Sequence, residues 1–357
     1  MLNSKKIFPV FLCIACFAFH SFAQSGRKKP SPTPTPQTIN GPSVKNLPTQ
    51  VVPPAPTSTP RPAAKDESDE IIKVNSVLVP IPVSVLDTSG KAVTDLKLTD
   101  FELKIDGKVV EIGDLARSET PIRMAMLFDN SASVLIARDF EKEAAVRFFR
   151  RVIRPEKDKA ALFSVADSTR LEQSITSNVS LLTQAIDLFP PPEGATALLD
   201  GIVEVANYLR STNGRRVVVI VSDGEDTGDL RTSLDAAVKA LQVNDCQVYV
   251  LKTTDFENFK RTGQRIGNAN TRQLIAERRM AEITAQTGGA VYSPIDEKEM
   301  NAAFDRISAE LAQQYILSYY PDDAAEKSGE FREISLTVKG KNLSVRTRKG
   351  YYVPKRN

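Results

Sequence analysis

Two nearly uninterrupted apolar runs in the middle of the 357-residue chain constrain its fold most strongly. One covers residues 122–128 and the other covers residues 217–221. A strand with one solvent-facing side alternates apolar and polar residues, whereas a strand covered on both sides does not need to. Both runs therefore indicate strands of a parallel sheet buried between two layers of helices.

Helical patterns alternate with these runs and with further short apolar segments. We expect strands at residues 122–128, 160–165, around 171, 216–221, 246–252 and 290–293. We expect helices at residues 137–153, 181–188, 196–209, 230–243, 271–286 and 297–313. This alternation predicts an α/β domain over residues 120–313, a doubly wound, mostly parallel sheet with helices on both faces, as in Rossmann-like folds.

The segments on either side of this domain have the period of two that is typical of half-buried strands. They cover residues 71–119 and 314–357, and each is too small to form a secure core alone. We therefore predict that they pack together as one small β-sandwich. Pro80 and Pro82 share one side of the first strand and remove two N–H groups there, so we expect an edge strand with that side unpaired.

The N-terminus has the pattern of a secretory signal over residues 1–23. Two lysines precede an apolar run that ends in small residues at Ala23. The run is short for a membrane span and has no stop-transfer charges, so cleavage is favoured over an uncleaved anchor or a lipoprotein. Residues 24–70 are rich in proline and predict a disordered linker, either a tether or a plain spacer. We expect an exported protein without a transmembrane span, located in the periplasm, on the cell surface or outside the cell.

Removal of this signal changes the inventory of reactive side chains. The mature chain would keep no histidine and one cysteine, Cys246, which opens a predicted buried strand and is expected to be inert. Catalytic groups that need histidine, and zinc sites made of histidine or thiolate, are thereby excluded. The signal carries two of the 47 basic residues, leaving 45 against 44 acidic ones and a net charge of +1, which gives no case for nucleic-acid binding. A bound metal must be a hard cation held by oxygen: Mg²⁺ first, with Mn²⁺ or Ca²⁺ as alternatives.

Side chains with suitable oxygens lie at the predicted ends of the buried strands. Asp129, Ser131 and Ser133 follow the first strand at a spacing that can wrap three oxygens around one point. Thr196 would add a hydroxyl from the loop before a helix, and Asp223 would add a second carboxylate after the run 217–221, directly or through water. Ligands of open α/β sheets bind at such strand ends. These residues could instead form only a helix cap and a turn.

The five residues resemble the metal-ion-dependent adhesion site of the von Willebrand factor type A (VWA) family. The family pattern is Asp-x-Ser-x-Ser after the first strand, a threonine in a later loop, and an aspartate after a central strand. All positions are filled, with Ala132 where many members have glycine. The resemblance covers residues 121–313. Residues 93–107, 314–321 and 346–352 also resemble segments of exported bacterial proteins with VWA-related domains.

The resemblance implies a binding protein and no enzyme, without catalytic residues or an organic cofactor. An acidic residue of a protein ligand would complete the coordination of the bound cation. The alternative is an envelope scaffold in which the cation only stabilises the fold. A metal-assisted hydrolase would need a general base, and Glu193 and Glu225 are the nearby candidates, though neither lies in a recognised catalytic motif. The acidic residues of 225–229 could form a second Ca²⁺ position, but their spacing does not fit the Ca²⁺-loop motif, so we favour a solvated acidic loop. The basic residues of 260–279 could form a docking patch for an acidic partner, but we favour a loop leading to an exposed helix face.

Overall fold

The computed structural model describes residues 78–117, 119–228, 231–265, 270–321, 327–340 and 342–353. They belong to one compact unit, Glu70–Asn357. The expected signal and linker lie outside the described residues, so these two assignments stay predictions. Within the described ranges, no helix has both the length and the apolar character needed to cross a bilayer.

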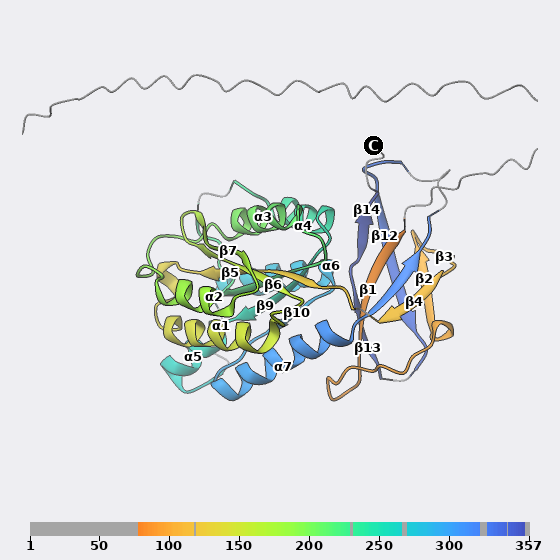
Figure 1. Ribbon diagram of the computed structural model, residues 1–357. Helices are drawn as coiled ribbons and strands as arrows, with labels where there is room; N and C mark the ends of the chain where they lie inside the picture. Colours follow the sequence, from red (N-terminus) through yellow and green to blue (C-terminus); the bar gives the residue numbers. More distant parts are fainter. Residues whose placement is uncertain are drawn as a thin grey trace, which may run out of the picture. The chain divides into compact units, whose positions relative to one another are not determined.

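A six-stranded sheet with the order β10-β9-β8-β5-β6-β7 forms the centre of the α/β part (Figure 1). Its strands are β5 (Ile122–Asp129), β6 (Lys159–Val165), β7 (Thr169–Thr176), β8 (Arg215–Ser222), β9 (Cys246–Lys252) and β10 (Ala290–Tyr292). All neighbours pair in parallel except β6 and β7, which are antiparallel. The predicted doubly wound, mostly parallel sheet is therefore confirmed, with one antiparallel edge strand.

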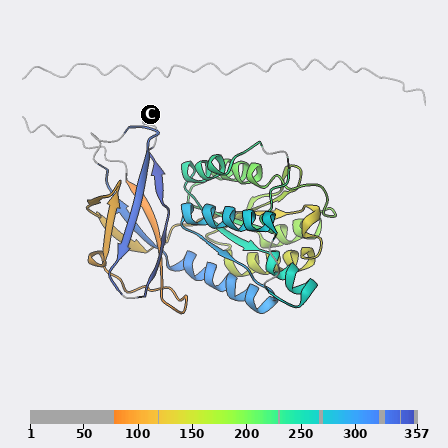
Figure 2. The ribbon, with the colours of Figure 1, turned by 180° about the vertical axis from the view of Figure 1, so that it is seen from behind.

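Helices cover both faces of this sheet, as predicted (Figures 1 and 2). The apolar side chains of α1 (Arg138–Val152), α2 (Val179–Asp187) and α7 (Glu297–Gln313) share one core with alternate residues of β5 and β8. Those of α3 (Leu198–Leu209), α4 (Leu234–Val243) and α6 (Thr271–Thr287) share the other. The uninterrupted apolar runs follow from this double burial.

One helix starts later than expected, and one helix was not expected at all. The expected helix from residue 230 begins only at Leu234, because the Ser233 hydroxyl accepts a hydrogen bond from the Ala236 amide at 3.2 Å and caps it there. The sequence analysis also missed α5 (Thr254–Thr262). This helix has 9 residues, and its large apolar side chains are Phe256 and Phe259 alone, so the pattern is too short to indicate a helix from sequence.

The two flanking segments form two four-stranded antiparallel sheets, and each sheet combines strands from both ends of the chain. One has the order β13-β1-β11-β4 and the other β14-β12-β2-β3. The strands are β1 (Val79–Leu86), β2 (Phe101–Ile105), β3 (Lys108–Val110), β4 (Asp114–Arg117), β11 (Tyr315–Tyr319), β12 (Phe331–Val338), β13 (Ser344–Thr347) and β14 (Gly350–Tyr352). Side chains of both sheets share one apolar core, which confirms the joint sandwich.

The position of β1 corrects one expectation. The strand with Pro80 and Pro82 is not at an edge, because it pairs with β11 on one side and with β13 on the other. The ladder with β13 begins only at Val83, however. The proline carbonyls on that side accept hydrogen bonds from side chains instead, those of Thr347 at 2.8 Å and Arg348 at 2.9 Å. The missing N–H groups thus shorten the ladder without placing the strand at the edge.

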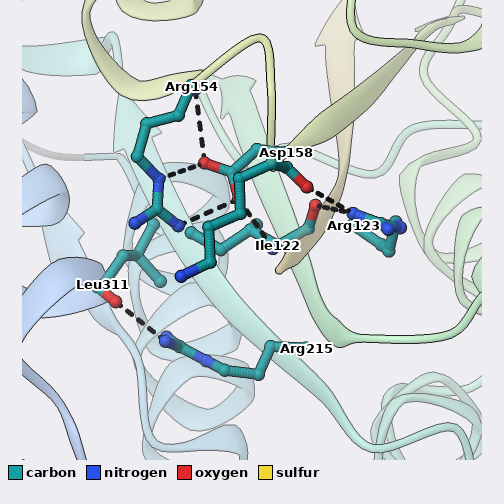
Figure 3. Close-up of polar contacts among 7 residues, drawn as sticks. Ile122, Arg123, Arg154, Asp158, Arg215 and Leu311 are labelled. Carbon is teal, nitrogen blue, oxygen red and sulfur yellow. Dashed lines mark hydrogen bonds and ion pairs between the residues drawn. The ribbon is translucent and has the colours of Figure 1, made fainter. Parts of the chain in front are cut away.

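A buried polar cluster fixes the start of β5 (Figure 3). Asp158 is fully buried and accepts hydrogen bonds from the Ile122 amide at 2.8 Å and from Arg154 Nε at 2.6 Å. Nearby, Arg215 donates to the Leu311 carbonyl at 2.8 Å and to Gln314 Oε1 at 2.7 Å. These contacts hold the first residue of the central strand and the end of α7 in fixed positions.

Candidate cation site

The candidate site lies where the winding direction of the sheet reverses. The chain runs from β5 to β6 and β7 on one side and then returns to β8, which pairs with β5 on the other side. Asp129 is the last residue of β5, and Asp223 directly follows β8. Because β5 and β8 are parallel neighbours, their carboxyl ends place these two carboxylates at the same edge, as ligand sites of open α/β sheets require.

Asp129 is fully buried, and both its carboxylate oxygens are held. Oδ1 accepts a hydrogen bond from the Ser131 amide at 3.0 Å, and Oδ2 accepts one from the Ser222 hydroxyl at 2.6 Å. The hydroxyl oxygens of Ser131 and Ser133 lie 3.0 Å apart. The structure thus brings the three residues of the first motif together. Ser222, which the sequence analysis did not single out, orients Asp129 from the neighbouring strand.

Thr196 joins this group through backbone hydrogen bonds between loops. It is 1% exposed, and its carbonyl accepts from the amides of Thr227 and Gly228, both at 2.9 Å. The same loop reaches the first motif, because the Ala132 amide donates to the Gly194 carbonyl at 3.2 Å. The loop carrying Thr196 is therefore held against both of its neighbours.

Asp223 is 6% exposed, and its Oδ1 accepts a hydrogen bond from the Glu225 amide at 2.8 Å. Asp223 therefore forms a turn, which was the alternative interpretation of this motif. It also lies close enough to Asp129 for its charge to act on that carboxylate. The alternative that the first motif only caps helix α1 is wrong. Helix α1 has Ala137 at its N-cap and no side-chain cap, so Asp129, Ser131 and Ser133 do not cap that helix.

The electrostatics of the site favour a bound cation. Burial, together with the negative charge of Asp223, raises the pKa of Asp129 to about 7. Two carboxylates in a poorly solvated position repel each other, and a divalent cation between them removes that repulsion. The hydroxyls of Ser131, Ser133 and Thr196 are neutral oxygen donors of the kind that Mg²⁺ accepts. The residues present therefore fit a hard divalent cation.

Part of the loop after Asp223 has a structural role that corrects the reading of a solvated acidic loop. Asp226 Oδ1 accepts hydrogen bonds from the amides of Leu198 and Leu199 at 2.8 and 3.4 Å, at the start of α3. Similarly, Arg279 in the basic segment donates to the Gly224 carbonyl at 2.8 Å. Asp229 lies outside the described residues.

Residues 124–299 match the family model of the von Willebrand factor type A domain. This part of the chain is a VWA domain, as its sheet and the order of its motifs led us to expect. No curated protein sequence matches it at a significant level.

Several solved structures are similar to it. BatB from Bacteroides thetaiotaomicron has 17% identity and a TM-score of 0.42, over 53% of this chain and 98% of that one. An aerotolerance-related membrane protein from Bacteroides fragilis has 21% identity and a TM-score of 0.41, over 53% and 98%. The vWF domain of the type V pili tip protein Mfa5 from Porphyromonas gingivalis has 11% identity and a TM-score of 0.41, over 53% and 94%.

Proposed function

We propose that this protein binds a protein ligand through a divalent cation held by Asp129, Ser131, Ser133, Thr196 and Asp223, with Mg²⁺ the preferred ion and Mn²⁺ or Ca²⁺ as alternatives. The observation that carries the proposal is the fully buried Asp129 carboxylate, which lies close enough to Asp223 for the negative charge of Asp223 to disfavour the charged form of Asp129. A cation bound mainly by neutral hydroxyls keeps much of its positive charge. An acidic side chain of the partner can then complete its coordination.

Hydrolysis at the bound cation is the competing activity, and it would depend on Glu193 or Glu225. Hydrolysis at a metal needs a general base within reach of the attacking water. Of the two acidic residues considered, Glu193 is exposed, and Glu225 is partly buried beside Asp223, whose charge acts with burial to raise its pKa. Neither lies in a recognised catalytic motif. We therefore assign no catalytic activity.

We propose that the protein binds its ligand outside the cytoplasm. The secretory pattern of residues 1–23 and the proline-rich residues 24–70 support this location. The second candidate is a scaffold of the cell envelope in which the cation only stabilises the fold. It is favoured by the burial of Asp129 and Ser131, because a cation that the chain encloses adds its binding free energy to folding.

The test is a pull-down from cell-envelope extract with the immobilised full chain, in Mg²⁺ and in EDTA. Asp129→Asn is the test variant, and Asp235→Asn is the control, since Asp235 is an exposed aspartate in the first turn of α4. A partner retained by the wild type and the control in Mg²⁺, and lost in EDTA and with Asp129→Asn, supports cation-bridged binding. A partner held equally under all these conditions contradicts it and leaves the scaffold role.

A further inference from the structure

A second buried carboxylate lies near the cation site and has no role in it. Glu141, in the first turn of α1, is 0% exposed. Neither of its carboxylate oxygens has a hydrogen-bond partner among the residues that the structure describes. A buried charge without a partner is strongly unfavourable, so native proteins pair it, bind a metal to it or keep it neutral.

Two other buried oxygens lie near Glu141, one from the N-cap residue of helix α5 and one from the first turn of this helix. The Thr253 hydroxyl, from a fully buried residue, and Glu257 Oε1 both lack a hydrogen-bond partner within the described part of the chain. The Glu257 amide donates to the Thr253 carbonyl at 3.1 Å, so the two residues are one helical turn apart and share a helix face.

A stacked aromatic pair holds α1 and α5 together at this point. The rings of Phe140 and Phe256 lie 3.8 Å apart between centroids, at an angle of 6°. Glu141 and Glu257 are the residues that directly follow them in sequence. The Thr253 hydroxyl lies close enough to Glu141 to favour its charged form, and the charge of Glu257 acts against it. Unsatisfied oxygens from two helices are thus gathered in one buried place.

Among the described residues, the charges of Arg138 and Arg261 act on this pair but offset its charge only in part. Arg138 precedes Glu141 by one turn, but its guanidinium donates to Asn130 Oδ1 and to the Pro190 carbonyl. Arg261 donates to the side chain of Asn258. Asp129 and Asp223 add further negative charge. Burial first, and then these carboxylates, raise the pKa of Glu257 to about 8 and that of Glu141 well above its ordinary value.

We propose that Glu141, Glu257 and the Thr253 hydroxyl form a second divalent-cation site beside the one at Asp129. Within the described ranges, no three Asp, Glu, His or Cys side chains form a metal-binding group. The second site would instead combine two carboxylates with one hydroxyl, and water would fill its remaining positions. The first site likewise combines carboxylates with hydroxyls. Such oxygen donors suit Mg²⁺, Mn²⁺ or Ca²⁺. A bound ion would also join α1 to α5 behind the ligand-binding loops.

Manganese binding to the full chain tests this proposal. Free Mn²⁺ gives a strong electron paramagnetic resonance signal that weakens on binding, so a titration counts the ions bound per chain. We expect two ions for the wild type and for the control Asp235→Asn, and one ion for Glu141→Gln and for Glu257→Gln. Circular dichroism verifies that each variant is folded. If Glu141→Gln does not fold, Glu257→Gln decides the question, because Glu257 is partly exposed and its replacement disturbs the core less.

The result separates the two sites. If the ion lost in Asp129→Asn differs from the ion lost in Glu141→Gln, both sites are supported. If the wild type binds a single ion that Asp129→Asn retains and Glu141→Gln loses, the second site stands and the proposed function fails. Mn²⁺ binding that folded Glu141→Gln and Glu257→Gln variants leave unchanged would overturn the second site.

Discussion

Replacing Asp129 by asparagine should stabilise the protein when no metal is present, although it removes the central residue of the proposed cation site. Asp129 is fully buried, and burial together with Asp223 raises its pKa from 3.8 to about 7. In EDTA at neutral pH the folded protein must therefore either hold an unfavourable charge or take up a proton. Asparagine has nearly the same shape and no charge. It can still accept from the Ser131 amide and can donate to Ser222 Oγ.

The size of the effect follows from the pKa difference. Each unit of pKa corresponds to about 1.4 kcal/mol, so the shift from 3.8 to about 7 corresponds to a free energy on the order of 4 kcal/mol. The folded-state pKa lies above the unfolded one. The wild type therefore keeps its full stability below about pH 3.8 and loses part of it as the pH rises toward 7. Allowing for altered hydrogen bonding, Asp129→Asn should exceed the wild type by roughly 2 to 4 kcal/mol at pH 7.5 in EDTA.

Urea unfolding at several pH values, in EDTA and in Mg²⁺, measures this difference. Mg²⁺ at a hundredfold excess over the Kd of the site at Asp129 should stabilise the wild type by about 2.7 kcal/mol more than it stabilises Asp129→Asn. Asp235→Asn should behave as the wild type does, because Asp235 is exposed. If Asp129→Asn were less stable than the wild type in EDTA at pH 7.5, the repulsion that we infer between Asp129 and Asp223 would be refuted.

Three other changes have defined outcomes. Asp158→Asn should lower the free energy of unfolding by roughly 2 to 4 kcal/mol, since it weakens the acceptor of the Ile122 amide. The pKa of Asp158 is lowered from 3.8, so this difference in stability, measured by urea unfolding, should shrink as the pH falls below 3.8. Cys246 should resist a thiol reagent until urea unfolds the chain, because burial raises its pKa to about 12. Gly289→Ala should lower the thermal midpoint, since its Cβ would lie 1.7 Å from the Val248 carbonyl oxygen; an unchanged midpoint would show that the strand can shift.

The main layers of the fold could be predicted from local sequence patterns. The apolar runs at 122–128 and 217–221 are long enough to show burial on both faces, and this requirement determines the sheet. The positions of Asp129 and Asp223 directly after these runs place two carboxylates at one edge once the strands are parallel. The sequence analysis therefore predicted the candidate site because its residues follow strands in chain order.

Contacts between residues far apart in sequence decided the rest. The proline strand lies inside its sheet because β13, from the other end of the chain, pairs with it beyond Pro82, and no local pattern shows such a partner. Glu141 looks like an ordinary acidic residue in the first turn of a helix. Its burial depends on α5, a helix too short for its pattern to be recognised, which packs through Phe256 against Phe140. Sequence alone determined which residues could bind a cation at the strand ends, while only the tertiary structure decided which carboxylates lose their contact with water, because desolvation depends on every element packed around them.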